Sequence, residues 1–242
     1  MFKISFITIT LNNKNGLNRT IESYISFNKK YPNSELVVID GLSTDGTNEI
    51  FDQYRSIIDI LICEKDNGIY DAMNKGLKLF TGDFVCFMNA GDEIIVDGMV
   101  ELVSILRIGH CFAGKVVWDN KIKSFDYINY LPWLLRLPIH QAMVIHKDLA
   151  YTFDLSFPIA SDIDQKLSIA KTAKLVNCNV VVALCESGGI SQNIPNFSKL
   201  RIRAKEIYNI SFKHFGLFIG ALNYIKFLLW HSLKLINRRH SI

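Results

Sequence analysis

Three loops that carry a carboxylate follow three short apolar segments of this sequence. Asp40 ends the run ELVVID, Asp66 follows residues 60–64, and Asp92 follows the run FVCFM. If these segments are parallel strands, their carboxyl ends meet at one edge of a sheet, where ligands bind. A buried carboxylate costs free energy unless a cation or an amide compensates it. The three acids together therefore indicate a site for a divalent metal ion or a metal-bound phosphate.

Helix capping is the alternative role for single acids in these loops. Asp45 precedes a predicted helix that begins at Asn48, and Asp66 precedes one that begins at Ile69. An acid at either place can accept a hydrogen bond from a free backbone N–H of the first helical turn. For each acid taken alone, both roles stay open.

The first half of the chain alternates apolar, β-branched segments with amphipathic ones. This alternation is typical of strand–helix–strand units, which build a parallel sheet through right-handed crossovers. The predicted strands are residues 3–10, 35–40, 60–64 and 84–88, and the predicted helices are residues 17–27, 48–58, 69–80 and 97–106. We therefore predict an α/β fold with a mostly parallel central sheet and helices on both faces.

The second half of the chain is less regular. The predicted elements are strands at residues 110–118, 121–127, 140–145 and 174–184 and a helix at residues 163–170. Asp119-Asn120 predicts the turn of a strand pair, and Gly188-Gly189 predicts another turn. Because no repeat or linker interrupts the sequence, we expect one domain over residues 1–198 and a helical appendage over residues 199–242.

Composition and cysteine content are typical of a globular protein from a reducing compartment. The chain has 242 residues, of which 49% are hydrophobic and 21% charged, enough for one sizeable core. Its five cysteines lack the paired spacing of a zinc site, and most lie in apolar runs, which indicates buried, reduced thiols. The segment MFKISFITIT alternates like a strand, unlike a signal peptide. We therefore expect a cytoplasmic protein.

Five blocks of the sequence resemble glycosyltransferase family 2. VVIDGLSTDGTNEI is similar to the family's nucleotide-binding loop, DNGIYDAMNKGLKLFTGDFVCFMNAGDE to its central block, and ITITLNN to its first strand and turn. ASDIDQKL and ESGGIS resemble two later blocks, so the resemblance spans residues 3–191. The subset it resembles most is that of bacterial polysaccharide, O-antigen and colanic-acid transferases. The resemblance implies a GT-A fold and a nucleotide-diphosphate sugar as donor.

The resemblance also implies roles for individual residues. Thr10 and Asn12 would line the nucleotide. Asp40 and Ser43 would lie near the base or the ribose. Asp92 would coordinate Mg²⁺ or Mn²⁺ on the donor diphosphate, whose leaving-group charge such an ion neutralises. The remaining predicted donor-site residues are Asp66, Asn74, Lys75, Asn89 and His140, of which His140 would contact the diphosphate or the acceptor.

Two of these residues have structural alternatives. Lys75 can be an exposed helical lysine, or it can pair with Asp71 four residues earlier in the same predicted helix. A lone histidine at the start of a strand, such as His140, is more often structural than functional.

Two glycines depart from the family pattern. Gly41 stands where many members carry a second acid that contacts the base. Gly91 lies in a motif that often reads Asp-x-Asp-Asp, so Asp92 is the carboxylate that remains there. Asn89 can contribute an amide oxygen to the same corner.

Asp162, in ASDIDQKL, matches the family's position for a catalytic base. An inverting transfer needs a base that takes the proton of the acceptor hydroxyl as the sugar carbon is attacked. Asp162 precedes the predicted helix at residues 163–170, whose N-terminus would keep the carboxylate ionised at neutral pH. The alternative is that Asp162 only caps this helix.

The C-terminal segment is basic and apolar. From Lys199 onward it carries nine basic residues and one acid, a net charge of +8. Lys226 interrupts the apolar run 212–235, so we expect no membrane-spanning helix. On a helical wheel, one side is apolar and the other carries Asn223 and Lys226, as in a helix that lies in a membrane interface. Packing on the domain or on a second subunit is the alternative. Nucleic acid is not an expected partner, because long apolar runs separate the basic residues.

These features predict an inverting transferase for bacterial surface polysaccharide or lipopolysaccharide. It would move a hexose or N-acetylhexosamine from a nucleotide sugar to a saccharide, such as one on an undecaprenyl carrier, at the inner face of the cell membrane. An oligomer is compatible with the sequence. An inactive nucleotide-sugar-binding or scaffold protein is the alternative that Gly41 and Gly91 support. A nucleotidyltransferase is disfavoured, because ITITLNNKNG has only Gly16 in place of a glycine-rich loop.

Overall fold

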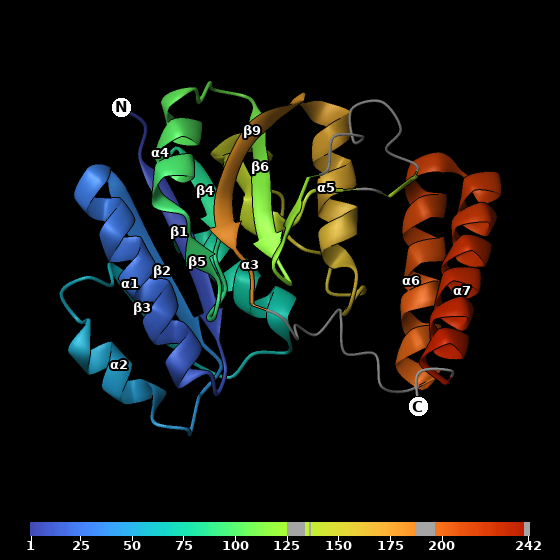
Figure 1. The fold of residues 1–242 in the computed structure, drawn as a ribbon, viewed down its shortest axis with the longest axis horizontal. Coiled ribbons are helices and arrows are strands. Elements are labelled where there is room, and N and C mark those ends of the chain that lie inside the picture. Colours follow the sequence, from blue (N-terminus) through green and yellow to red (C-terminus); the bar gives the residue numbers. More distant parts are fainter. Residues whose placement is uncertain (125–133, 136, 187–196, 240–242) are drawn as a thin grey trace.

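The computed structural model describes residues 1–124, 134–135, 137–186 and 197–239, and the side chains of all of these except residues 197–199 and 230–239 (Figure 1). Within these ranges a nine-stranded mixed sheet has the strand order β3-β2-β1-β4-β8-β6-β9-β5, with β7 beside β6. The strands are β1 (Ile4–Thr10), β2 (Ser34–Asp40), β3 (Ile60–Cys63), β4 (Phe84–Phe87), β5 (Glu93–Ile94), β6 (Cys111–Trp118), β7 (Lys121–Lys123), β8 (Met143–His146) and β9 (Leu175–Leu184). The helices are α1 (Lys14–Lys30), α2 (Thr47–Gln53), α3 (Ile69–Leu79), α4 (Val96–Ser104), α5 (Ser161–Thr172), α6 (Phe197–Phe215) and α7 (Leu217–Arg239).

The parallel half of the sheet consists of β3, β2, β1 and β4, as predicted from the first half of the chain. Their apolar residues alternate between two separate core clusters. Ile4 and Phe6 contribute to one cluster, and Ile7 contributes to the other. Both faces of these strands are therefore covered, which explains why β2 is a nearly continuous apolar run rather than an alternating one.

Helices cover both faces of the sheet, which confirms the predicted α/β architecture (Figure 1). Leu17 and Ile21 of α1 and Met99 of α4 pack in one core cluster. Met73 of α3 and Leu167 of α5 pack in the other. The helical crossovers place the loops after β1, β2 and β4 at one edge of the sheet.

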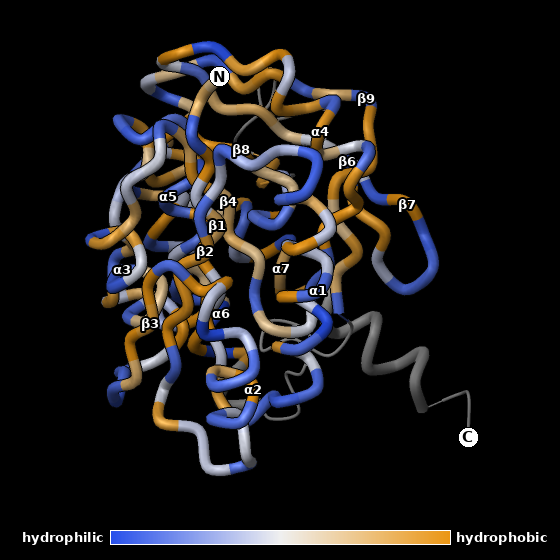
Figure 2. Tube along the Cα trace, turned by 90° about the vertical axis from the view of Figure 1, so that its left-hand side faces the viewer, coloured by the Kyte–Doolittle hydropathy of each residue, from blue (hydrophilic) through white to orange (hydrophobic). Residues whose placement is uncertain are grey.

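The second half of the sheet is largely antiparallel. β8 is antiparallel to β4 and to β6, whereas β9 runs parallel to β6. Asp119 and Asn120 form the predicted turn between β6 and β7, both with positive φ, as the tight turn of a hairpin requires. This turn is hydrophilic in Figure 2. The predicted strand at 121–127 ends at Lys123, and residues 125–127 lie outside the described part of the chain.

Two predicted boundaries were wrong in ways that matter for the site. The predicted strand at 140–145 begins as the 3-10 helix η2 (His140–Ala142), closed by a hydrogen bond from the Ala142 N–H to the Ile139 carbonyl, and only then continues as β8. The predicted helix at 17–27 starts earlier, because the Asn13 side chain caps α1 by accepting from the Gly16 N–H.

The prediction of one continuous helix over residues 212–235 was wrong. Gly216, with φ of +84°, separates α6 from α7, and the two helices pack side by side as a hairpin. Asn223, predicted on the solvent side, is 3% exposed and donates a hydrogen bond to Ser211 of α6. No helix in the described residues is long and apolar enough to cross a membrane.

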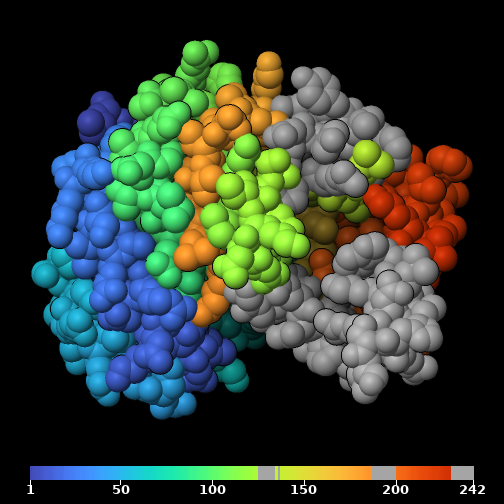
Figure 3. All heavy atoms as spheres, viewed as in Figure 1, coloured from blue at the N-terminus to red at the C-terminus, as the bar shows by residue number. Residues whose placement is uncertain are grey.

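Polar contacts of three α6 side chains hold this helix against the rest of the protein. Glu206 accepts hydrogen bonds from the backbone N–H groups of Ile159 and Ala160, just before α5. Asp164 of α5 accepts from Lys213 and contacts His214 at 2.8 Å. In the space-filling view α6 and α7 form a lobe at the right-hand side (Figure 3). One face of α6 thus belongs to the core, as the alternative of packing on the domain predicted.

Candidate active site

Hydrogen bonds connect the loops after β1 and β2 at the sheet edge. Thr10 and Asp40 are paired at the ends of their strands. The Asp40 carboxylate is buried and accepts from the Ser43 hydroxyl at 2.5 Å and from the Ser43 N–H at 3.0 Å. The hydroxyl oxygen of Thr10 is buried and has no hydrogen-bond partner among the described residues. Asp40 therefore shapes the loop, while Thr10 keeps a polar atom for a ligand.

Asn12 joins the same two loops. It has a φ of +50°, its N–H donates to the Ser43 hydroxyl, and its side-chain oxygen accepts from the Thr44 N–H at 2.8 Å. The structure thus brings Thr10, Asn12, Asp40 and Ser43 together, as the resemblance implied for a nucleotide site.

Asp66 lies against the glycine that departs from the family pattern. A Cβ at Gly41 would lie 2.7 Å from Oδ2 of Asp66. The other oxygen of Asp66 accepts from the Gly68 N–H at the start of α3. The loop after β3 thus supplies a carboxylate beside the position where Gly41 lacks one.

Asp92 is buried at the turn between β4 and β5. Its side chain accepts from Gln141 Nε2 at 2.8 Å and from the Glu186 N–H at 3.0 Å, and the residue is 4% exposed. Burial raises the pKa of Asp92 to about 6, although both hydrogen bonds act in the opposite direction. Neutral donors hold this carboxylate, and no cation does among the described residues.

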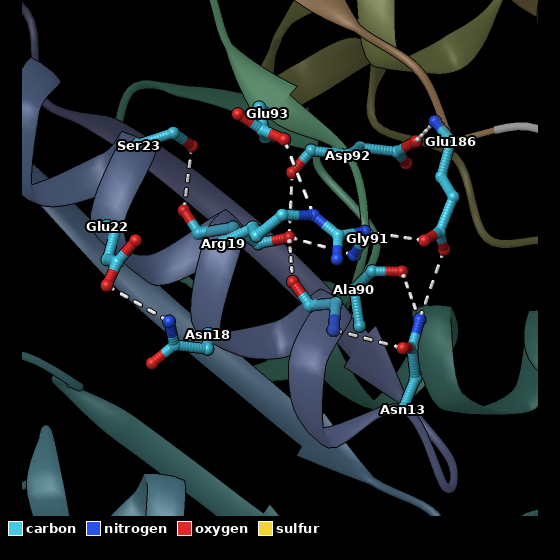
Figure 4. A network of polar contacts seen from close by, with 12 residues as sticks. Asn13, Asn18, Arg19, Glu22, Ser23, Ala90, Gly91, Asp92, Glu93 and Glu186 are labelled. Carbon is cyan, nitrogen blue, oxygen red and sulfur yellow. Dashed lines mark hydrogen bonds and ion pairs between the residues drawn. The ribbon is translucent and has the colours of Figure 1, made fainter.

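Glu186 brings a second carboxylate to this turn from the end of β9 (Figure 4). A Cβ at Gly91 would overlap the Glu186 carboxylate, and Gly91 has a φ of +104° that favours glycine. Arg19 of α1 pairs with Glu186 at 2.5 Å, and Asn13 donates to Glu186 and to the Ala90 carbonyl. At both positions where a glycine departs from the family pattern, another loop supplies an acid: Asp66 lies beside Gly41, and Glu186 lies beside Gly91.

The residues around Asp92 fit a divalent ion that a diphosphate helps to hold. Asn89 adds a side-chain oxygen that is buried without a partner among the described residues. The described chain has no cluster of three His, Cys, Asp or Glu residues able to bind a metal alone. Magnesium commonly binds through one or two carboxylates together with substrate phosphates, and Asp92 with Asn89 suits that mode.

Asp162 lies in the first turn of α5 in an ionic environment. Its carboxylate accepts from Lys166 Nζ at 2.7 Å and from the Tyr70 hydroxyl at 3.0 Å. Burial alone would raise its pKa, but the buried Lys166 ammonium, His140 and Tyr70 together lower the pKa of Asp162 to about 2. The carboxylate is therefore ionised at neutral pH. The structure assigns the N-cap position to Ala160 instead, so Asp162 does not cap α5.

His140 lies between the turn that carries Asp92 and the carboxylate of Asp162. Its Nε2 is 3.4 Å from the Asn89 amide nitrogen, and its Nδ1 is 4.0 Å from the Asp162 carboxylate. Burial, and next the Lys166 ammonium, lower the pKa of His140 to about 4, so the imidazole is neutral at pH 7. This contact chain connects the end of β4 to Asp162.

Asn74 and Lys75 form structural contacts instead of opening toward this edge. The Asn74 amide donates to the Phe153 carbonyl and accepts from the Phe153 N–H, which uses both of its polar atoms. Lys75 bonds the Lys65 carbonyl and pairs with Glu64 at 3.1 Å, not with Asp71. These contacts favour a structural role for both residues over the predicted contact with a donor.

Sequence reasoning missed several residues that contact Asp92 or Asp162. Lys166 follows Asp162 by four positions on one helix, a spacing that suggests an ion pair. Glu186 begins the block ESGGIS. No local signal points to Tyr70, because its contact to Asp162 joins residues 92 positions apart.

The mixed sheet with helices on both faces is the GT-A fold. The sequence model of glycosyl transferase family 2 matches residues 5–152, more than half of the chain, so the chain belongs to this family.

Two curated relatives are named for bacterial envelope glycans. TuaG of Bacillus subtilis (strain 168), a glycosyltransferase named for teichuronic acid biosynthesis, is 31% identical over 135 residues, which are 53% of each chain. The PGL/p-HBAD biosynthesis glycosyltransferase of Mycobacterium bovis (strain BCG / Pasteur 1173P2) is 30% identical over 177 residues, 66% of this chain and 68% of the relative. The match thus spans about half the length of TuaG.

Two solved structures share the fold. S. aureus TarS 1-349 in complex with UDP-GlcNAc has a TM-score of 0.63 at 17% identity, covering 93% of this chain and 71% of that one. The mannosyltransferase PcManGT from Pyrobaculum calidifontis, in complex with GDP-Man and Mn²⁺, has a TM-score of 0.66 at 16% identity, covering 96% and 75%.

Proposed function

We propose that this protein is an inverting glycosyltransferase that uses a nucleotide-diphosphate sugar. The observation that carries the proposal is the contact chain Asn89–His140–Asp162, which joins the turn at Asp92 to an ionised carboxylate. A donor with its nucleotide at Thr10 and Asn12 and its diphosphate at Asp92 would present its sugar along this chain. The transferred group would be a hexose or an N-acetylhexosamine.

Asp162 has the charge and place of the base in this proposal. The acceptor hydroxyl oxygen forms a bond to the anomeric carbon as the bond to the donor phosphate oxygen breaks, and Asp162 takes the hydroxyl proton. Because Lys166 keeps the pKa of Asp162 near 2, the carboxylate is a weak proton acceptor. We expect the proton to move late, when the attacked hydroxyl has become acidic.

A divalent ion, Mg²⁺ or Mn²⁺, would be held by Asp92 and Asn89 and would neutralise charge on the departing diphosphate. Gln141 must then release its hydrogen bond to Asp92, and its own unpartnered oxygen becomes available to the same corner. Asp66, beside Gly41, would contact the nucleotide in place of an acid at that position.

The acceptor in this proposal is a lipid-linked saccharide of the bacterial envelope, such as one on an undecaprenyl carrier. The names of two relatives, which refer to teichuronic acid and PGL/p-HBAD biosynthesis, support an envelope glycan. The basic residues and exposed apolar side chains of α6 and α7 support a location at the inner membrane surface. The site would belong to residues 1–198, and the membrane contact to residues 199–242.

The test separates donor binding from transfer. UDP-, GDP- and dTDP-sugars are screened by calorimetry with Mn²⁺, and transfer is then assayed with the donor that binds. We expect Asp162→Asn to keep the donor Kd and to lower transfer about 10²- to 10⁴-fold, the range for loss of a general base. Asp97→Asn, which removes an exposed acid paired with Lys30, is the control and should leave both unchanged.

Two outcomes would contradict the proposal. Full transfer by Asp162→Asn would exclude Asp162 as the base. Donor binding by the wild-type protein without transfer to any lipid-linked acceptor would favour the inactive nucleotide-sugar-binding or scaffold protein.

A further inference from the structure

A groove between α6 and α7 lies outside the site described above. It has a volume of about 540 Å³, and we call it the α6–α7 groove. Arg201, Ile202 and Lys205 line it from α6, and Tyr224 and Ile225 line it from α7. Its described lining includes no carboxylate.

Two cations at this groove have no partner within the described part of the chain. Arg201 and Lys205 are one helical turn apart, so both side chains reach the same side of α6. Both are exposed, and neither forms a hydrogen bond or ion pair with another described residue. Other lysines of this lobe do have partners, since Lys213 pairs with Asp164 and Lys226 donates to the Leu134 carbonyl. The groove therefore offers two cations to an external anion.

An apolar stripe on α7 includes Ile225, which lines the same groove. Phe218, Leu222, Ile225 and Leu229 recur at helical spacing on one side of α7 and are between 40% and 78% exposed. Ile202, on the opposite wall, is 47% exposed. Exposed apolar side chains that cluster in this way mark an interaction site. Its matching ligand joins an anion to a hydrocarbon chain.

We propose that the α6–α7 groove binds an anionic phospholipid of the membrane surface, a partner that deepens the proposed membrane location and rests on it. The lipid phosphate lies between Arg201 and Lys205, and an acyl chain lies along Ile202 and Ile225. Charge complementarity favours this occupant over a second copy of the chain, whose groove carries the same two positive charges.

The proposed lipid site and the candidate base share one turn of α6. Lys205 faces the groove, while the next residue, Glu206, faces inward and holds the Ile159–Ala160 backbone just before Asp162. A lipid held at this turn would place the membrane surface on the outer side of the helix that supports the base. Such an arrangement suits an acceptor that is itself anchored in the membrane.

The first test is sedimentation of the full chain with vesicles of phosphatidylcholine alone or with 30 mol% phosphatidylglycerol. We expect binding only to the anionic vesicles. Each cation near an anionic surface contributes about 1 kcal/mol, so the double variant Arg201→Ala/Lys205→Ala should lose roughly 30-fold in partition. The control Lys29→Ala/Lys78→Ala removes two exposed lysines elsewhere and should keep binding within about threefold. Equal losses in both double variants would overturn the site.

Further measurements exclude the other occupants. Ile225→Ser should weaken vesicle binding several-fold, and inorganic phosphate should not compete at millimolar concentration; full competition would replace the lipid with free phosphate. Light scattering that shows a wild-type dimer, broken by the double variant while its vesicle binding is unchanged, would assign the groove to a second copy. Donor binding is measured in every variant and should be unchanged, so failure of the lipid site stays distinct from failure of the proposed transferase.

Discussion

Asp92 and Asp162 are two largely buried carboxylates of one candidate site, yet their environments oppose each other. Gln141 and a backbone N–H hold Asp92, and burial raises its pKa to about 6. Lys166 holds Asp162 and overcomes the effect of burial, so its pKa falls to about 2.

The difference indicates a division of labour. A buried carboxylate without a cation gains most from an arriving positive charge, which suits Asp92 to a metal ion on a diphosphate. A carboxylate with a permanent ammonium partner stays charged before any ligand arrives, which suits Asp162 to proton transfer. The candidate site thus contains Asp92, which has no cationic partner among the described residues, and Asp162, which is paired with Lys166.

The largest effect is expected when the Lys166 ammonium is removed, because Asp162 would then lose its cation and the contrast with Asp92 would disappear. Lys166→Met leaves a buried, unpaired carboxylate, so we expect about 3–5 kcal/mol lower stability at neutral pH. The pKa of Asp162 should rise above its usual value, so the acidic limb of kcat/KM that reports Asp162 should move to higher pH than in the wild type. The wild-type profile should be free of an Asp162 limb at neutral pH.

Lys171→Met is the matched control, since Lys171 is an exposed lysine in the last turn of the same helix. Its stability and pH profile should follow the wild type. If Lys166→Met also kept the wild-type pH profile, Lys166 would not set the charge of Asp162.

Removing the charge of Asp92 should instead stabilise the protein when no metal is present. Because its pKa is raised, ionisation lowers wild-type stability as the pH increases from about 4 through 6. Asp92→Asn should therefore be roughly 1–3 kcal/mol more stable than wild type at pH 8 and equal to it below pH 4. Gln141 can turn its unpartnered oxygen toward the new amide.

Denaturant unfolding at pH 4 and pH 8 measures this effect, and Mn²⁺-dependent donor binding should be lost in the same variant. A less stable Asp92→Asn protein at pH 8 with normal Mn²⁺ dependence would show that Asp92 is structural.

Asp162 should depend on α6 for its position, whereas Asp92 should not. Glu206→Ala removes the acceptor for two N–H groups near Asp162, at a cost of about 1–3 kcal/mol. Transfer should fall several-fold at an unchanged donor Kd. Glu206→Gln keeps a carbonyl oxygen there and should restore most of the rate. An equal loss of donor affinity in Glu206→Ala would indicate general unfolding instead.

The smallest predicted effect concerns the acid beside Gly41. Asp66→Gly should weaken nucleotide binding about fivefold, which is roughly 1 kcal/mol. Gly41→Asp alone places two carboxylates against each other, because a Cβ at position 41 would lie 2.7 Å from Oδ2 of Asp66. This variant should also weaken nucleotide binding. The double variant moves the carboxylate from one loop to the other and should recover affinity. Additive losses would show that the two positions are not equivalent.

The sequence predicted the parallel half of the sheet because its signals are local. The apolar run of β2 and the helical spacing of α3 each lie within a few positions. The resemblance to the family implied the cluster of Thr10, Asn12, Asp40 and Ser43, and the contacts between these residues agree with it.

The remainder depended on contacts between distant residues. Asn74 is held by Phe153, 79 positions away, which no periodicity reveals. The Glu186 carboxylate covers Gly91 from another strand. In the tail, Gly216 reverses the chain, so a wheel drawn through it combined two helices and misplaced Asn223.

The most direct test is to measure the two carboxyl pKa values in the ligand-free protein by ¹³C NMR of labelled aspartate, with Asp92→Asn and Asp162→Asn for assignment. We predict about 6 for Asp92 and about 2 for Asp162, with the Asp92 value falling when a donor nucleotide and Mg²⁺ are added. Two values near 4 that do not respond to nucleotide and Mg²⁺ would contradict the division of labour between the two acids.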